Sequence, residues 1–235
     1  MMENNNRPIG IIGAMTAEVE GLISKLEDHK SELIGGIEFH TGRIFSKDVV
    51  IAKCGVGKVF AAMCCEAMII RYNPRLIVNT GVGGAISPEL SCADIVVATS
   101  LCQHDMDTTP LGEPRGIISG IDKIYFEADE ASANLLIAEA KRLGIPAKRG
   151  VIATGDVFVA DAEKKKFISE AFGASVCEME GAAIAQAAYV SKIPFAVVRA
   201  ISDGADGNSP LDFPTFLSIA VKSSESLTLA LIEKY

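Results

Sequence analysis

Short apolar runs that favour β-strands alternate with helix-like segments along this chain, and no other feature limits its fold as strongly. The Ile-Gly-Ile-Ile run of 9–12 gives way to helical periodicity, and the same alternation continues to the C-terminal segment. Strands and helices in this order pack as a parallel or mixed sheet flanked by helices. The sequence therefore predicts an α/β protein.

The individual elements follow from hydrophobic periodicity and from capping residues. Strands are expected at 9–14, 38–43, 48–53, 76–79, 94–98, 149–153, 175–178 and 195–201, the second and third forming a hairpin. Helices are expected at 16–26, 58–72, 130–143, 181–190 and 214–233. The long irregular segment 102–125 is predicted to be functional, as loops of that length commonly are. Because the 235 residues contain no linker or repeat, we predict one domain, residues 1–235.

Composition and charge exclude several classes of partner. The net charge is −8, and the largest basic cluster, the three lysines at 164–166, is typical of a solvated helix face. Nucleic-acid binding is therefore not expected. No apolar stretch approaches the roughly 20 residues of a membrane span, and the polar start MMENNNRP lacks the parts of a secretory signal. We expect a cytoplasmic protein that binds no membrane.

The cysteines indicate a reducing compartment and no metal centre. Six of them are scattered through apolar surroundings and form no Cys-x-x-Cys pair. With three histidines elsewhere in the chain, neither the spacing nor the residue types fit a closed zinc site. We expect buried, reduced thiols.

Two glycine-rich motifs do not match the known nucleotide-binding signatures. The sequence GVGKV at 55–59 has Val59 where a P-loop requires Ser or Thr, and it lacks the earlier glycine of that motif. The sequence TGVGGA at 80–85 follows a predicted strand but is not Gly-x-Gly-x-x-Gly. It indicates either a tight turn or a close approach of the backbone to another group.

Four acidic residues lie next to predicted strand ends or helix starts: Glu18, Glu178, Glu180 and Asp203. A carboxylate at position 18 is favoured by the helix dipole alone, so its placement fits either a local or a functional role. Residues 178 and 180 face the same side of an extended segment, and they either converge on one ligand or cap the next helix. Asp203 is either a turn residue or part of a site at a strand's C-terminal end.

Together these segments resemble the family of 5′-methylthioadenosine/S-adenosylhomocysteine nucleosidases, within the wider purine nucleoside phosphorylase/hydrolase superfamily. The matching motifs are IGIIGAMTAEVE (9–20), CGVGKVFAA (54–62), VNTGVGGAISP (78–88), QHDMDTTPLG (103–112), ATGDVFVAD (153–161), CEMEGAAIAQAA (177–188) and VVRAISDGAD (197–206). Seven motifs in the family's order cover nearly the whole chain. The resemblance implies a three-layer α/β/α fold with a central mixed, partly barrel-like sheet.

The resemblance also implies two catalytic residues. Asp203 matches the family's general acid, which protonates N-7 of adenine so that the base leaves neutral. A carboxyl that donates a proton at neutral pH requires a dry, apolar setting, and Ser202 is expected to orient it. Glu18 matches the residue that activates the attacking water on the opposite face of the sugar.

Further residues are implied to bind the substrate. Glu180 matches the acceptor of the ribose hydroxyls and Met179 the residue packed on the ribose. Phe158 matches the aromatic stacked on adenine, Val159 the neighbour whose backbone pairs with the base edge, and Phe213 a wall of the 5′-alkylthio pocket. Arg199 and Glu178 match positions at the edge of the site, in a supporting role. Met15, Val56 and Val82 complete the implied pocket.

Two positions depart from the family pattern. Val82 stands where the best-known members carry Ser, which removes a hydroxyl that could assist a phosphate. Leu111 stands where some members offer Phe from the partner subunit, so the resemblance does not predict how tightly large 5′ groups are held.

From the resemblance we expect hydrolysis of 5′-methylthioadenosine and S-adenosylhomocysteine, and of 5′-deoxyadenosine, in methionine salvage and methyl-cycle detoxification. It also implies a homodimer and no metal or organic cofactor. The alternatives are a nucleoside phosphorylase, an aminodeoxyfutalosine hydrolase, and a non-catalytic nucleoside-binding or storage protein. Asp203, Glu18 and Glu180 argue against the last, because binding alone requires no acid and base on opposite faces.

Overall fold

A computed structural model of the chain describes residues 7–203 and 213–235, with side chains for all of these except 203 and 213–216. The strands are β1 Ile9–Gly13, β2 Glu27–Ile34, β3 Ile37–Ile44, β4 Lys47–Lys53, β5 Leu76–Ala85, β6 Ile95–Gln103, β7 Phe126–Glu127, β8 Ala147–Thr154, β9 Ala174–Glu178 and β10 Phe195–Asp203. The helices are α1 Thr16–Ile23, α2 Lys58–Tyr72, α3 Glu130–Leu143, α4 Ala162–Phe172, α5 Gly181–Val190 and α6 Phe213–Lys234, with a short 3-10 helix, η1, at Thr109–Leu111.

The sheet is mixed and closes on itself over part of its width. Strands β10, β6, β8, β9 and β5 are paired in that order, and β10 pairs with β5 as well, which closes a five-stranded barrel. Strands β1, β4, β3 and β2 continue the sheet outward from β5. Parallel pairs such as β1–β5 and β10–β5 occur beside antiparallel ones such as β10–β6. The predicted mixed, partly barrel-like sheet is confirmed.

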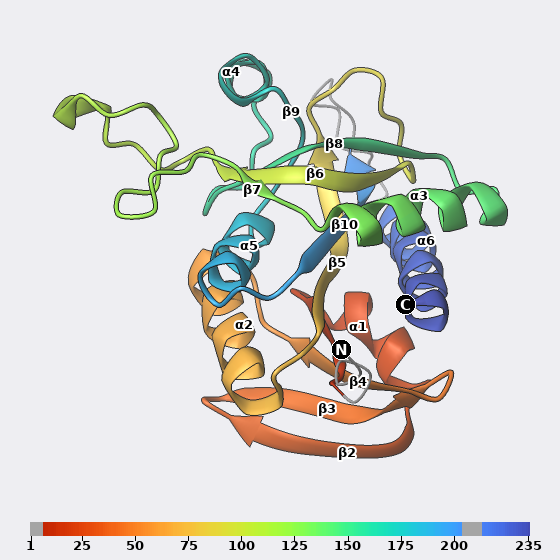
Figure 1. The fold of residues 1–235 in the computed structure, drawn as a ribbon. Coiled ribbons are helices and arrows are strands. Elements are labelled where there is room, and N and C mark those ends of the chain that lie inside the picture. Colours follow the sequence, from red (N-terminus) through yellow and green to blue (C-terminus); the bar gives the residue numbers. More distant parts are fainter. Residues whose placement is uncertain (1–6, 204–212) are drawn as a thin grey trace.

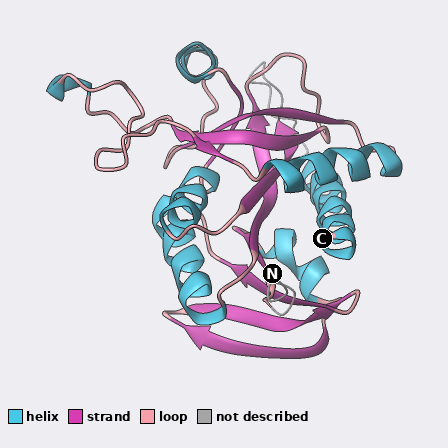
Figure 2. Ribbon diagram, viewed as in Figure 1, coloured by secondary structure: helices cyan, strands magenta, loops and turns pink. Residues whose placement is uncertain are grey.

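Helices cover the sheet from two sides (Figures 1 and 2). Helices α2 and α5 pack against each other on one side, while α3 and α1 pack against α6 on the other. The first layer buries apolar side chains such as Cys65, Met68 and Ile184 against the strands, and the second buries Leu22, Leu136 and similar residues. The three-layer arrangement predicted from the sequence is therefore also confirmed.

Three helices begin and end at the residues that the sequence predicts, namely α2, α3 and α5. Helix α3 illustrates the local reason. The Asp129 side chain accepts a hydrogen bond of 2.8 Å from the Ser132 N–H at its start. At its end, Gly144 has a φ of 69°, a left-handed conformation that glycine adopts without strain.

Strands β5 and β6 extend well beyond their predicted ends. Strand β6 continues to Gln103 rather than ending at residue 98, with a register irregularity between Ala98 and Ser100. Strand β5 continues to Ala85, so TGVGGA is a strand and not a tight turn. The glycines in this part of β5 allow other groups to approach the backbone closely. A Cβ at Gly81, for example, would lie 2.6 Å from a carboxylate oxygen of Glu18.

Other differences lie at the edges of the fold. The first helix ends at Ile23 and not at residue 26, because β2 begins at Glu27. Strand β2 was not predicted, since its residues are mostly polar and exposed and it joins the sheet through backbone pairing with β3 alone. No helix in the described ranges is long and apolar enough to cross a membrane.

The irregular segment begins at His104, two residues later than predicted, and ends at Tyr125 before β7. It contains η1 and projects from the body of the molecule, on the side that carries α2 and α5 (Figure 1). Leu111, at the end of η1, is 80% exposed.

Candidate active site

A pocket opens where β1 and β10 end and where the last residues of β5 meet the end of β9. Its lining residues are Ala14, Met15, Glu18, Val56, Val82, Gly83, Gly84, Val157, Phe158, Val159, Cys177, Glu178, Met179, Glu180 and Ser202. Ten residues that the sequence analysis assigned to the site are among them. The segments that meet here lie far apart in the sequence, so the closed part of the sheet is what assembles the pocket.

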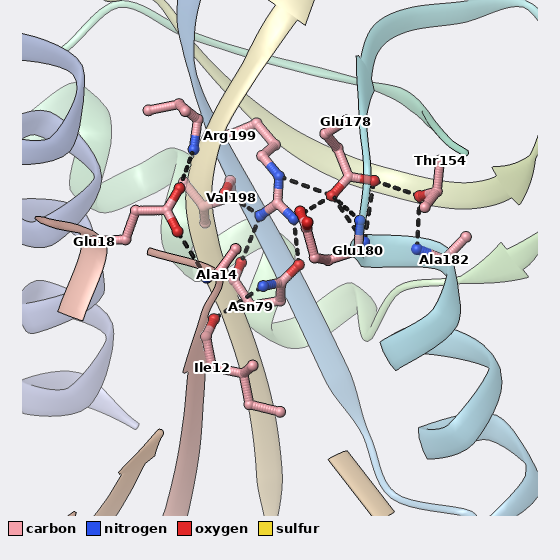
Figure 3. Close-up of polar contacts among 12 residues, drawn as sticks. Ile12, Ala14, Glu18, Asn79, Thr154, Glu178, Glu180, Ala182, Val198 and Arg199 are labelled. Carbon is pink, nitrogen blue, oxygen red and sulfur yellow. Dashed lines mark hydrogen bonds and ion pairs between the residues drawn. The ribbon is translucent and has the colours of Figure 1, made fainter. Parts of the chain in front are cut away.

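Glu18 is held at the pocket by backbone donors from two elements (Figure 3). Its Oε2 accepts hydrogen bonds from the N–H groups of Ala14 at 2.7 Å and Met15 at 2.9 Å. Its Oε1 accepts one of 3.0 Å from the Val82 N–H on β5. Burial raises the pKa of Glu18 and outweighs these donors, which lower it. Glu18 is therefore a fixed, buried carboxylate with a pKa above that of an ordinary glutamate.

Arg199 lies behind the pocket, fully buried, and ties β10 to β5 and β9 (Figure 3). Its guanidinium forms an ion pair with Glu178 and a hydrogen bond with the Asn79 side chain. Asn79 in turn donates to the Ile12 carbonyl at 2.9 Å. Burial by itself would lower the pKa of Arg199, but Glu178, Glu180 and Glu18 raise it. Arg199 is therefore a permanent buried cation at the centre of three carboxylates.

Glu178 points to this arginine and to the start of α5. It accepts hydrogen bonds from the Gly181 N–H at 2.8 Å and the Glu180 N–H at 3.1 Å, and from the Thr154 hydroxyl. A carboxylate that receives the first N–H groups of a helix acts as its cap. Of the two roles left open for residues 178 and 180, Glu178 has the capping role.

Glu180 points in a different direction. The chain turns at this residue, the N-cap position of α5, so the two carboxylates do not share the direction expected of an extended segment. Its Oε1 accepts a hydrogen bond of 2.9 Å from the Gly57 N–H. Burial, and then the neighbouring charge of Glu178, raise the pKa of Glu180 to about 7. Glu180 is thus the carboxylate of the pair with acceptor capacity left for a ligand.

The remaining walls of the pocket are apolar and of unequal burial. Val159 is buried, whereas Phe158 is 67% exposed and Val56 is 52% exposed. Met15 and Met179 line the space between the acidic residues and these walls. An apolar pocket with a few converging polar groups is the usual form of a small-molecule site.

Two predicted site residues with described side chains, Arg199 and Leu111, do not line the pocket. Arg199 is fully buried beside Glu178, and Leu111 lies on the projecting segment. The backbone of Asp203 ends β10 opposite Gly84, but its side chain lies outside the described residues. Phe213 begins α6, and its side chain likewise lies outside the described residues. Ser202, by contrast, is buried and lines the pocket, and its hydroxyl donates to the Gly83 carbonyl at 3.3 Å.

Sequence reasoning missed the residues that orient the carboxylates. Thr154 and Asn79 end or interrupt apolar strands with a polar side chain, which is a signal for a buried polar partner. Gly57 had no such signal, because its contribution is a backbone N–H. In residues 7–203 and 213–235, no group of three or more His, Cys, Asp or Glu side chains is arranged to hold a metal ion.

The fold and the site together define a class: α/β proteins with a barrel-closed mixed sheet and an acidic, small-molecule pocket at the strand ends. The family model of the phosphorylase superfamily matches residues 8–233, and the chain belongs to that family.

Comparisons with individual proteins agree with the family. A protein of Shewanella sediminis named 5′-methylthioadenosine/S-adenosylhomocysteine nucleosidase is 39% identical over 228 residues, covering 96% of this chain and 99% of the relative. A Campylobacter jejuni protein named aminodeoxyfutalosine nucleosidase is 36% identical and covers 96% of this chain and 98% of its own length. A solved structure of a mutant Helicobacter pylori nucleosidase with 5′-methylthioadenosine in the active site has a TM-score of 0.93 at 32% identity, covering 97% and 99%.

Proposed function

We propose that this protein hydrolyses the N-glycosidic bond of 5′-methylthioadenosine and S-adenosylhomocysteine, and of 5′-deoxyadenosine, releasing adenine and the 5-substituted ribose. The protein is a nucleosidase that uses water as its nucleophile. The observation that carries the proposal is the placement of Glu18, a buried carboxylate with three backbone donors, in the same pocket as Glu180. Residues 1–235 act as one nucleosidase domain.

Glu18 is the general base in this proposal. Loss of adenine leaves an oxocarbenium-like ribose, and a water held by Glu18 attacks it after giving up a proton. Three N–H donors hold the carboxylate in place, so the base needs no reorganisation when the proton arrives. Because burial raises the pKa of Glu18, it accepts that proton more readily than an exposed glutamate would.

Asp203 is the proposed general acid, which protonates N-7 of the departing adenine. It stands at the end of β10, where the preceding Ser202 and Ile201 are buried. Positioned proton transfer of this kind is worth roughly 10²- to 10⁴-fold in rate.

Asp203→Asn keeps the shape of the side chain but has no carboxyl proton, so turnover should fall about 10²-fold or more while inhibitor binding changes less. Turnover within a few-fold of wild type would exclude this role.

Glu180, Met179, Phe158 and Val159 are proposed to bind the nucleoside. Glu180 accepts hydrogen bonds from the ribose hydroxyls, and its negative charge also favours the cationic sugar of the transition state. Met179 packs on the ribose, while Phe158 stacks on adenine and the Val159 backbone pairs with the base edge. Phe213 is proposed to form a wall of the 5′-alkylthio pocket. No metal or organic cofactor takes part in this scheme.

Water rather than phosphate is the proposed nucleophile, because the pocket repels anions. None of its described lining residues is a lysine or arginine, whereas Glu18, Glu178 and Glu180 are acidic. At a separation of about 4 Å and an effective dielectric near 20, one unit-charge repulsion disfavours phosphate by about 4 kcal/mol. Val82 adds no hydroxyl that could assist.

The test is to incubate the protein with 5′-methylthioadenosine, with and without millimolar phosphate, and to identify the sugar product. We expect free 5-methylthioribose at a rate that phosphate does not change. A phosphorylated sugar formed at a phosphate-dependent rate would establish a phosphorylase instead, and no release of adenine would support a non-catalytic nucleoside-binding protein.

A second candidate substrate is aminodeoxyfutalosine, because one relative at 36% identity is named for its cleavage. Both substrates carry adenine on a 5′-modified ribose, so the same acid and base would serve. Comparing kcat/KM for the two nucleosides decides between them. We expect the higher value for 5′-methylthioadenosine.

We also propose a homodimer in which the projecting segment reaches the partner's pocket and contributes Leu111 to the 5′ side. Helix α2 carries the exposed apolar residues Val59, Met63 and Ile70, which are spaced to form one stripe. This helix lies on the side of the molecule from which the projecting segment extends (Figure 1). A stripe of this kind is typical of an interface. Light scattering should give twice the chain mass of 24.8 kDa. A fully active monomer would contradict the proposal.

The compartment is proposed from composition and burial. Cys54, Cys64, Cys65 and Cys102 are buried, and burial raises the pKa of each thiol, which keeps it in the unreactive form. Buried reduced thiols fit a reducing compartment, and the proposed location is therefore the cytoplasm.

A further inference from the structure

The segment Gly55–Lys58, which resembles a P-loop only superficially, leads into α2 in an unusual way. Gly57 is the N-cap residue of this helix and has a φ of 100°, so a glycine is required and no side chain can cap the helix. Two carboxylates from distant elements receive the first N–H groups instead. The Gly57 N–H donates to Glu180 at 2.9 Å, and the Lys58 N–H donates to Asp156 at 2.8 Å.

The Lys58 side chain connects the same segment to the end of β6. Its Nζ donates to Oδ1 of Asp105 at 2.7 Å and to Oε1 of Gln103 at 3.0 Å. The other carboxylate oxygen of Asp105 accepts a hydrogen bond of 2.9 Å from the Asp156 N–H. The side chains of Lys58 and Asp105 are 20% and 23% exposed, so this ion pair is partly shielded from water. Three segments therefore meet at one closed set of hydrogen bonds.

Asp156 belongs to the segment 155–159, which carries the residues proposed to contact adenine. Besides the contacts of Asp156, contacts of Gly155 hold this segment in place. The His104 ring lies against Gly155 so closely that a Cβ there would be 2.4 Å from Nε2. The Gly155 N–H donates to the Glu178 carbonyl at 3.1 Å. Beyond Asp156, in contrast, Val157 and Phe158 are 41% and 67% exposed. Packing alone does little to hold them.

We propose that Lys58, Asp105 and Asp156 form a clamp that fixes the segment 155–159 relative to Glu180, so that the adenine wall and the ribose acceptor are held at a set separation. The inference rests on the proposed function and identifies Lys58 as a positioning residue for nucleoside binding. Through the Gly57 N–H, the clamp also connects directly to the carboxylate that receives the ribose hydroxyls.

The expected consequence of breaking the clamp is a loss of affinity with little loss of turnover. A free segment 155–159 must be ordered each time a nucleoside binds, and that ordering opposes binding. The acid and the base stand on other elements, at the end of β10 and on α1. A change that weakens substrate and transition state equally raises KM and leaves kcat nearly unchanged.

The decisive variant is Lys58→Met, which keeps the length of the side chain and removes its charge and donors. We expect KM for 5′-methylthioadenosine to rise about tenfold while kcat stays within about threefold. The dissociation constant, measured by calorimetry in a Glu18→Gln background, should rise by the same factor. Lys58→Arg should restore most of the affinity, which a requirement for the methylene chain alone would not explain.

Lys53→Met is the matched control, since this exposed lysine precedes the same segment and its Nζ contacts Thr16 at 3.3 Å. It should leave KM and kcat unchanged. Asp105→Asn should raise KM as Lys58→Met does, and the double variant should be no worse than the worse single one. If Lys58→Met does not fold, Asp105→Asn carries the test.

The outcomes separate the clamp from the function it serves. A wild-type protein that does not cleave 5′-methylthioadenosine refutes the proposed function. An active wild type whose Lys58→Met and Asp105→Asn variants keep the wild-type KM and dissociation constant refutes the clamp alone. A fall in kcat at unchanged KM would also refute it, because it would place Lys58 in the chemical step.

Discussion

The polar floor of the pocket (Glu18, Glu178 and Glu180, together with Arg199 directly behind them) and its apolar rim (Val56, Val157 and Phe158) are built in opposite ways. Every floor residue is less than a tenth exposed and is hydrogen bonded to another element. The rim residues are 41% to 67% exposed. The floor is therefore preorganised for chemistry, whereas the rim depends on neighbours, and on the ligand itself, to complete it.

The difference has a physical reason. Developing charge in a transition state is stabilised best by groups that need not move, and strand ends inside a closed sheet provide them. Recognition of a flat base requires a surface that the ligand can reach from solvent, so apolar side chains must stay accessible before binding. Changes in the floor should accordingly affect catalysis or stability strongly, and changes in the rim should affect affinity moderately.

The largest expected effect comes from Glu18→Gln. A glutamine offers one acceptor oxygen where two carboxylate oxygens receive three N–H groups, and it cannot accept a proton from water. Turnover of 5′-methylthioadenosine should fall about 10³-fold in a steady-state assay. Glu20→Gln, on the exposed side of the same helix, is the control and should keep wild-type turnover. An active Glu18→Gln enzyme would show that the floor does not supply the base.

Arg199→Met should have the next largest effect, on stability. It leaves Glu178 buried without its cation and removes the partner of Asn79. Breaking a buried ion pair from one side lowers the free energy of unfolding by about 3–5 kcal/mol, measurable by urea titration. Arg149→Met removes the partner of Glu130 on the surface and should leave stability close to wild type. Equal losses in the two variants would remove the distinction between floor and surface.

The pH dependence of stability should show the raised pKa of Glu180, about 7 against an ordinary value of 4.5. Between these values the folded protein holds a proton that the unfolded chain releases, so this residue's contribution to stability falls as pH rises from 4.5 to 7. Glu180→Gln does not titrate. Its stability relative to wild type should therefore grow across that window, by up to about 3 kcal/mol, and stay level above it. A difference independent of pH would contradict the assignment.

The smallest effect is expected at the rim. Phe158→Ala removes the surface proposed to stack on adenine, and KM should rise about tenfold with kcat nearly unchanged, since stacking on an aromatic ring is worth about 1–3 kcal/mol per base. Phe45→Ala, at an exposed turn between β3 and β4 that does not line the pocket, should change neither constant. A large fall in kcat for Phe158→Ala would mean that rim and floor do not act separately.

The sequence by itself determined the α/β class, the bounds of helices such as α3 and α5, and most of the residues that line the pocket. Helix bounds depend on local interactions, such as the Asp129 cap and the left-handed Gly144, which a few neighbouring residues specify. The pocket residues were predicted through motifs whose order matches a family. Neither the local capping interactions nor the family motifs depend on which strands are neighbours in the sheet.

Tertiary structure alone decided the rest. Strand β2 could not be predicted, because most of its side chains are polar and exposed and its place in the sheet comes from backbone pairing with β3. The different directions of Glu178 and Glu180 depend on Arg199, 21 residues away in the sequence from Glu178, and on the Gly57 N–H, 123 residues away from Glu180. Hydrogen bonds from a backbone N–H leave no periodic trace in the sequence, since every residue type except proline carries that donor. In the sequence, Lys58 belongs only to a motif that does not match a P-loop. Its proposed positioning role depends on the folded structure, which brings the end of β6 and the segment after β8 next to it.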